Sequence, residues 1–233
     1  MKQNGILLSL TDKEFDLIQE VGDDHVGTSL ETPMKENAHV ISDAEKVEKI
    51  AQHFAQIMDT LGLDLTDDSL RGTPMRVAKM YVEEVFGGLN PKARPDIKLF
   101  ENKYGYNEML VEKDVKVHSF CEHHFVPIIG KAHVAYINSG NVVGLSKLNR
   151  IVDYYAKRPQ VQERLTVQIA NDLKQALETE DVAVIIDAKH MCVSLRGIED
   201  VTSTTITASY NGAFKNADKK EEFLSYVYGS KKS

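Results

Sequence analysis

The hydrophobic pattern of this chain changes from helical to strand-like near residue 97, and this change constrains the fold more than any other feature. The segments beyond it are, in order, two of strand type, two of helical type and two of strand type: 109–120, 125–137, 144–158, 159–178, 181–197 and 202–214. A short C-terminal helix is expected over 218–229. We therefore predict a β–β–α–α–β–β core of mainly antiparallel strands, which is an α+β fold.

Two helices are expected ahead of this core. Ser42 and Glu45 fit a capping box at the start of the first helix. Thr73 is a plausible N-cap of the second, with Pro74 at its first helical position. Residues 1–40 show little periodicity, so we predict a variable N-terminal arm over 1–40. A single domain over 41–233 would then consist of helices at 41–90 and the mixed core at 91–233.

Composition narrows the class of protein. The chain has 233 residues, 42% of them apolar and 27% charged, which is typical of a soluble globular protein. Its net charge of −7 argues against non-specific binding to nucleic acid. The sequence contains no apolar run of about 20 residues and no recognisable secretion signal, so we expect no membrane segment and a cytoplasmic location.

The two cysteines of the chain lie in histidine-containing stretches. Cys121 and His124 stand three apart, and Cys192 follows 68 residues after His124. Cys, His and Cys ligands would leave one position of a tetrahedral zinc ion for water, whose pKa would fall to about 7. Two alternatives stay open at this point: a single disulfide, or two small buried hydrophobic residues.

Further candidates flank these cysteines. Strand alternation over 181–197 would place His190, Cys192, Ser194 and Arg196 on one face, either as a catalytic wall or as the wet face of an edge strand. His123 is suited to proton transfer near neutral pH, or to a structural role beside the metal. We expect Glu122 to point away from its neighbours into solvent.

Cations and a carboxylate mark two helix starts. Ser146, Lys147 and Arg150 fall in the first turn or so of the predicted helix at 144–158, which suits phosphate binding or a solvated basic turn. Gln162 and Glu163 open the next helix, where Glu163 could bind the edge of a purine or form a surface ion pair.

Three long motifs, read together, resemble the zinc-dependent (type IA) form of GTP cyclohydrolase I. They are "CEHHFVPIIGKAHVAYI", "GLSKLNRIVDYYAKRPQVQERLT" and "HMCVSLRGIED", and the similarity extends from about Ser42 to the C-terminal helix. The resemblance implies a tunnelling fold (T-fold), with an antiparallel sheet, helices on one face and additional N-terminal helices. It also implies allosteric control and a toroidal homodecamer with sites at subunit interfaces.

The resemblance assigns roles to individual positions. It implies zinc ligands at Cys121, His124 and Cys192, and acid/base histidines at His123 and His190. The substrate GTP would be converted to 7,8-dihydroneopterin triphosphate with release of formate. That reaction opens folate and pterin biosynthesis.

The remaining implied roles concern the substrate. Its binding residues would be Arg76, Lys147, Arg150, Gln162, Glu163 and Arg196. Glu163 would hold the guanine edge with Gln162 beside it, and Arg76 would reach the site of a neighbouring subunit. The other cations would bind the triphosphate, and Ser146 would assist the later sugar rearrangement.

Two other functions compete with this one. A nitrile reductase on the same fold would use a cysteine nucleophile and a nicotinamide cofactor, and would not need the Cys, His and Cys set together. A non-enzymatic module would use zinc structurally to support an interaction or purine-binding surface. Intact His123 and His190 argue against the second alternative.

Overall fold

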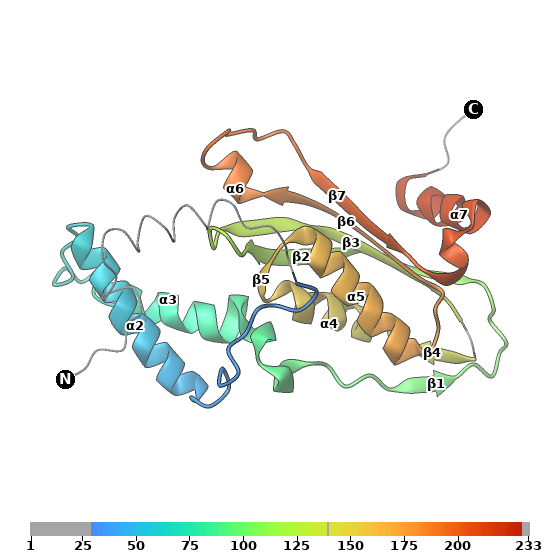
Figure 1. The fold of residues 1–233 in the computed structure, drawn as a ribbon, viewed down its shortest axis with the longest axis horizontal. Coiled ribbons are helices and arrows are strands. Elements are labelled where there is room, and N and C mark those ends of the chain that lie inside the picture. The colour runs from blue at the N-terminus through green and yellow to red at the C-terminus, as the bar shows by residue number, and fades with distance from the viewer. Residues whose placement is uncertain (1–28, 139, 230–233) are drawn as a thin grey trace.

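The core of the protein is one twisted sheet of five strands. The computed structural model describes residues 29–138 and 140–229, and orders these strands β5-β2-β3-β6-β7 (Figure 1). They are β2 (Met109–Cys121), β3 (Pro127–Ile137), β5 (Pro159–Gln160), β6 (Val182–His190) and β7 (Thr205–Tyr210). Every neighbouring pair is antiparallel except β2 with the short β5. A second sheet pairs β1 (Leu99–Glu101) with β4 (Asn141–Val143).

Helices pack on both faces of the large sheet. Helices α4 (Leu145–Ala156) and α5 (Gln162–Leu177) cover one face, as Figure 1 shows, and enclose the main apolar core with β2, β3 and β6. Helix α7 (Ala217–Tyr228) lies at the opposite face, where Phe214 and Phe223 pack with strand residues into a smaller core. The predicted β–β–α–α–β–β order and α+β class are confirmed, with α7 as an additional layer.

The N-terminal helices differ from the prediction in detail. Helix α2 (Asp43–Thr60) begins as expected, because Ser42 Oγ accepts the Glu45 N–H at 3.2 Å. Helix α3 (Thr73–Lys79) has Gly72 as its N-cap, so Thr73 was wrongly assigned. The Thr73 hydroxyl instead accepts from Arg76. The chain continues through a π-helix and two 3₁₀ turns: η2 (Met80–Val85), η3 (Gly87–Leu89) and η4 (Pro91–Ala93).

The long strand predicted over 181–197 is wrong beyond His190. Residues Met191–Ser194 form a short helix, α6, whose last turn is closed by the Leu195 N–H donating to the Met191 carbonyl at 2.9 Å. The Ser194 hydroxyl donates back to the His190 carbonyl at 3.3 Å, a bond typical of helical geometry. Strand β7 is likewise shorter than predicted and is followed by the 3₁₀ turn η5 (Gly212–Lys215).

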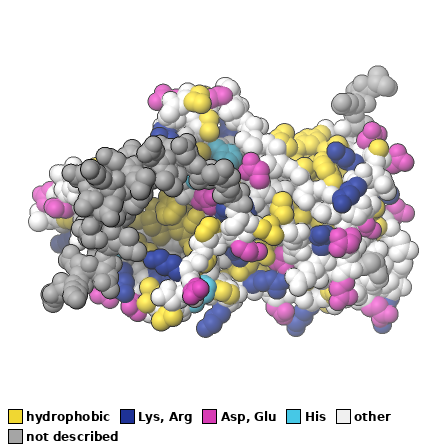
Figure 2. All heavy atoms as spheres, viewed as in Figure 1, with side chains coloured by type: hydrophobic (Ala, Val, Ile, Leu, Met, Phe, Trp, Pro, Cys, Tyr) yellow, Lys and Arg dark blue, Asp and Glu magenta, His cyan; other side chains and the backbone are white. Residues whose placement is uncertain are grey.

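Among the described residues, no helix is both long and apolar enough to cross a membrane. Acidic and basic side chains are interspersed over the part of the face in Figure 2 that the described residues form.

Candidate metal centre and active site

Strand register explains why residues distant in sequence meet at one end of the sheet, where the inner strands β2 and β6 finish and β3 begins. Phe120, near the end of β2, pairs with Pro127 at the start of β3. Ile128 pairs in turn with His190, the last residue of β6. Because β3 is antiparallel to both neighbours, the ends of β2 and β6 lie on either side of its start. The turn that follows Cys121 and the α6 helix that follows His190 therefore project from the same end of the sheet (Figure 1).

These two segments bring together the predicted metal ligands. The ligand atoms of Cys121, His124 and Cys192 all lie within 4.8 Å of one another. Cys121 Sγ is 3.9 Å from His124 Nδ1. In a tetrahedral zinc site, bond lengths of about 2.3 Å to sulfur and 2.1 Å to nitrogen separate two such ligands by about 3.6 Å. The donor set therefore fits a tetrahedral metal ion with one position left for a further ligand.

The electrostatics of the two thiols also favour a cation. Burial raises the pKa of the Cys192 thiol, and the adjacent Cys121 raises it further, because two neighbouring thiolates repel each other. A divalent cation between the sulfurs would reverse both effects and stabilise the thiolates. Both cysteines are free thiols, so the disulfide alternative is not what the structure contains.

An exposed cationic side chain lies directly beside the three predicted metal ligands, which we call the metal group. Arg196 Nη1 is 2.8 Å from His124 Nε2. Arginine only donates, so Nε2 accepts in this contact only while the ring proton is on Nδ1, and a metal bound at Nδ1 would break the contact. The prediction that Arg196 lies near Cys192 was correct, but the reason for it was wrong. The loop after α6 brings Arg196 there, because the strand ends at His190.

His123 and Glu122 belong to a charged network that reaches helix α5. His123 Nδ1 is 3.9 Å from Cys121 Sγ, and His123 Nε2 is 3.7 Å from Glu122 Oε1. Glu122 was expected to face solvent, and this prediction is wrong. Its carboxylate accepts two hydrogen bonds from Arg164, one of them at 3.2 Å from Nη2, and the Arg164 side chain is only 2% exposed.

Arg164 also anchors the first described residues of the chain. Its Nε donates to the Ser29 carbonyl at 2.9 Å, and Gln168 Nε2 donates to the Leu30 carbonyl at 2.9 Å. Sequence reasoning did not identify Arg164. One feature of the sequence could have identified it. Arg164 and Gln168 are four residues apart, so they share a face of a helix whose apolar stripe begins at Leu165.

His190 is held by the first residue of α5. Strand β5 pairs with the end of β2, and this pairing places Gln162 and Glu163 near the site. His190 Nε2 is 2.7 Å from Gln162 Oε1. Burial lowers the pKa of His190, and the nearby Glu163 carboxylate opposes that shift. Glu163 is exposed in the first turn of α5.

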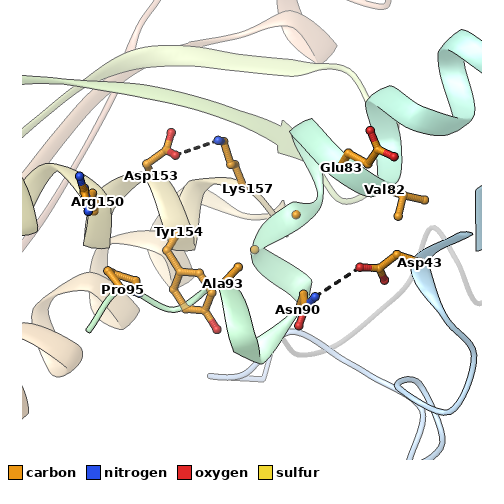
Figure 3. A pocket seen from close by; sticks show the side chains of 12 residues that line it. Asp43, Val82, Glu83, Asn90, Ala93, Pro95, Arg150, Asp153, Tyr154 and Lys157 are labelled. Carbon is orange, nitrogen blue, oxygen red and sulfur yellow. Dashed lines mark hydrogen bonds and ion pairs between the residues drawn. The ribbon is translucent and has the colours of Figure 1, made fainter. Parts of the chain in front are cut away.

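Four predicted residues lie apart from this group in the part of the chain that the structure describes. Ser146 and Lys147 lie in the first turn of α4, whose N-cap is Gly144. Arg150 lines a separate cavity of about 390 Å³, built by α4 with the segments around η2 and η3 (Figure 3). Arg76 donates to the Ser69 carbonyl at 3.1 Å and to the Thr73 hydroxyl at 3.3 Å, both close by in its own segment.

Known proteins are similar in sequence to this chain over most of its length. The family model described as GTP cyclohydrolase I matches residues 50–228, a range that contains the metal group. A GTP cyclohydrolase 1 from Flavobacterium johnsoniae is 58% identical over 212 residues, which cover 91% of this chain and 95% of that protein. The one from Vibrio cholerae is 54% identical over 196 residues, covering 84% and 89%. The one from Escherichia coli O1:K1 / APEC is 50% identical over 216 residues, covering 92% and 96%.

The matched range includes the Cys, His and Cys group and the two histidines beside it, which the strand register has brought to one end of the sheet. The resemblance seen in the sequence motifs is thereby confirmed, and the chain belongs to the GTP cyclohydrolase I family.

Proposed function

We propose that the site at this end of the sheet converts GTP to 7,8-dihydroneopterin triphosphate and formate, the first step of folate and pterin biosynthesis. The observation that carries the proposal is the convergence of Cys121, His124 and Cys192 with His123 and His190 on either side. A metal group flanked by two proton-transferring histidines suits hydrolytic opening of a heteroaromatic ring.

Zinc is the metal that we assign to the group. Two thiolates and one imidazole are soft and borderline donors, which select zinc over magnesium or calcium. When bound, zinc would lower the pKa of water to about 7 and act as a Lewis acid, which supplies the nucleophile for C8 of the purine. Cys121, His124 and Cys192 would hold it.

The two histidines would transfer protons at different steps of the reaction. His123 is partly exposed beside Cys121, which suits protonation of the purine N7 as the imidazole ring of GTP opens. His190 is half-buried and its pKa is lowered by that burial, which suits proton transfer during opening of the ribose ring. Closure of the rearranged sugar onto the pyrimidine would then complete the pterin.

The charged residues would orient the substrate. Glu163 is exposed at the start of α5, where its carboxylate would accept hydrogen bonds from the guanine edge. Arg196 and Lys147 would bind the triphosphate, since guanidinium and ammonium groups pair well with phosphate oxygens. Ser146, exposed in the first turn of α4, would assist the sugar rearrangement.

The separation of Arg76, Ser146, Lys147 and Arg150 from the metal group in the single chain supports an oligomeric site, to which they would contribute from a neighbouring subunit. Arg76 would complete the site of a neighbouring subunit within a toroidal homodecamer, with Arg150 on the triphosphate path. Strand β7 is at an edge of the described sheet, and exposed apolar residues cluster in the segment before it: Leu195, Ile198 and Val201. An open edge and an apolar patch suit pairing with another copy of the chain.

Two further predictions belong with this function. We propose a cytoplasmic location, because reducing conditions keep the metal-binding thiols of Cys121 and Cys192 reduced. We also propose an arm at 1–40 and one domain at 41–233. In the described part of that arm, the Ser29 and Leu30 carbonyls accept hydrogen bonds from Arg164 and Gln168 of α5.

A metal assay combined with incubation on GTP tests the proposal. We expect one zinc ion per chain, release of formate, and a product that becomes fluorescent as a pterin after oxidation. In the same assay, His190→Ala should keep its zinc and bind GTP but lose turnover by about 10²- to 10⁴-fold. Loss of metal from His190→Ala would contradict the role given to His190.

The competing functions give different results in this assay. Stoichiometric zinc together with formate release excludes the nitrile reductase, which would instead consume a nicotinamide cofactor. Zinc without formate release from GTP would refute the enzyme and favour a structural zinc in a purine-binding or interaction module.

A further inference from the structure

The side chain of Gln162 is enclosed between helix α5 and the sheet. The residue is 1% exposed although it is the first residue of its helix. Its two Nε2–H bonds face three acceptors, so one is shared: the Ile186 carbonyl at 3.1 Å, the Thr205 carbonyl at 2.8 Å and the Thr207 hydroxyl at 3.1 Å. These acceptors come from β6 and from the neighbouring strand β7, so the amide ties the start of α5 to both strands.

The orientation of this amide is determined by its partners. Backbone carbonyls only accept hydrogen bonds, so the amide nitrogen must face Ile186 and Thr205. The amide oxygen must then face His190, whose Nε2 is 2.7 Å away. Because that oxygen accepts only, this hydrogen bond requires a proton on His190 Nε2. Nδ1 is therefore the only ring nitrogen at which His190 can exchange a proton with a substrate.

The same contacts limit what Gln162 can do for the substrate. Both polar atoms of its side chain are already bonded inside the protein. The next residue, Glu163, is rotated by about 100° around the helix and is exposed. A substrate that approaches the helix start would meet the Glu163 carboxylate, and would have to break existing hydrogen bonds to reach the Gln162 amide.

We propose that Gln162 is a positioning residue for His190, and that its side chain does not contact GTP. It holds the His190 ring by its Nε2–H and leaves Nδ1 for proton transfer. This inference rests on the proposed function of His190 in turnover. It replaces the substrate-binding role that the family resemblance suggested for the Gln162 side chain, and leaves the guanine edge to Glu163.

The test compares kcat with KM in Gln162→Met, a substitution of similar size that removes both polar atoms. We expect kcat for formate release to fall by about 10- to 100-fold, the range typical when a group that orients a functional histidine is removed. The KM for GTP should stay unchanged. A raised KM with wild-type kcat would show that the side chain binds substrate, and would overturn the proposal.

A double variant separates positioning from general structural damage. In a His190→Ala background, adding Gln162→Met should change kcat by less than about twofold, because the histidine to be positioned is absent. A multiplicative loss would assign Gln162 a structural role instead. The matched control is Gln168→Leu, since Gln168 is equally buried on α5 and bonds to Gln160 and Leu30 rather than to a histidine. Its kcat should equal that of the wild type.

The outcomes also distinguish this inference from the proposed function. If His190→Ala keeps wild-type kcat, the role of His190 in turnover fails. If His190→Ala loses turnover but Gln162→Met does not, the positioning role fails alone. Should Gln162→Met not fold, Gln162→Asn serves the same purpose. Its amide is one methylene shorter and cannot reach His190 and both strands at once, so it too should lower kcat without raising KM.

Discussion

Breaking the ion pair between Arg164 and Glu122 should destabilise the protein strongly. The Arg164 side chain is 2% exposed and that of Glu122 is 18% exposed, so the pair is largely withdrawn from water. Arg164→Met would leave the Glu122 carboxylate without its partner and remove the hydrogen bond to the Ser29 carbonyl. Removing one member of a buried pair costs about 3–5 kcal/mol, because the remaining charge stays desolvated. We expect a loss of free energy of unfolding in this range.

Urea unfolding followed by circular dichroism measures this loss, at one protein and metal concentration, since assembly and metal binding shift apparent stability. The control is Lys157→Met, which removes an exposed pair with Asp153 and should cost at most about 1 kcal/mol. The double variant Glu122→Gln with Arg164→Met should be more stable than the sum of the single changes predicts, by about 1–3 kcal/mol. A loss below about 1 kcal/mol for Arg164→Met would refute the reasoning.

Three further outcomes are expected. Cys192→Ser should lose bound zinc and GTP turnover together, measured by metal analysis and formate release; retention of stoichiometric metal would remove Cys192 from the ligand set. Arg76→Ala should be inactive alone but regain activity in mixed oligomers with Cys192→Ser chains, and a lack of rescue would contradict a role in the neighbouring site. Burial lowers the pKa of His133 below 6.5, so the unfolded state binds the extra proton first, and stability should fall as pH drops below about 6.5. His133→Gln should flatten that part of the stability curve measured by urea unfolding, and an unchanged slope would show that His133 does not cause it.

Local patterns in the sequence predicted most of the elements correctly. Ser42 caps α2 because its cap requires only residues within one turn. The order of strands and helices follows from hydrophobic periodicity, which reports which face each element buries. The predictions failed where a local sequence pattern is compatible with more than one type of secondary structure. The segment after His190 alternates like a strand, yet it turns into α6 and thereby moves Cys192 next to Cys121.

The charged network around Glu122 could not be predicted in the same way. Nothing near Glu122 in the sequence specifies Arg164, because the partners are 42 residues apart on a turn and a helix. The same holds for Gln162, whose neighbours on β6 and β7 fix its amide and direct its oxygen at His190. Contacts of this kind depend on how α5 packs on the sheet, which the residue pattern of α5 alone does not state.

By itself, the sequence determined which residue types are available and which family they belong to, since the motifs around Cys121 and Cys192 are specific in combination. Only the tertiary structure decided how they meet. The antiparallel register of β2, β3 and β6 places the two cysteines within reach of one ion, although they are far apart in the chain. The physical reason is that hydrogen bonding between strands fixes their relative positions to within a residue, whereas the intervening sequence leaves them free.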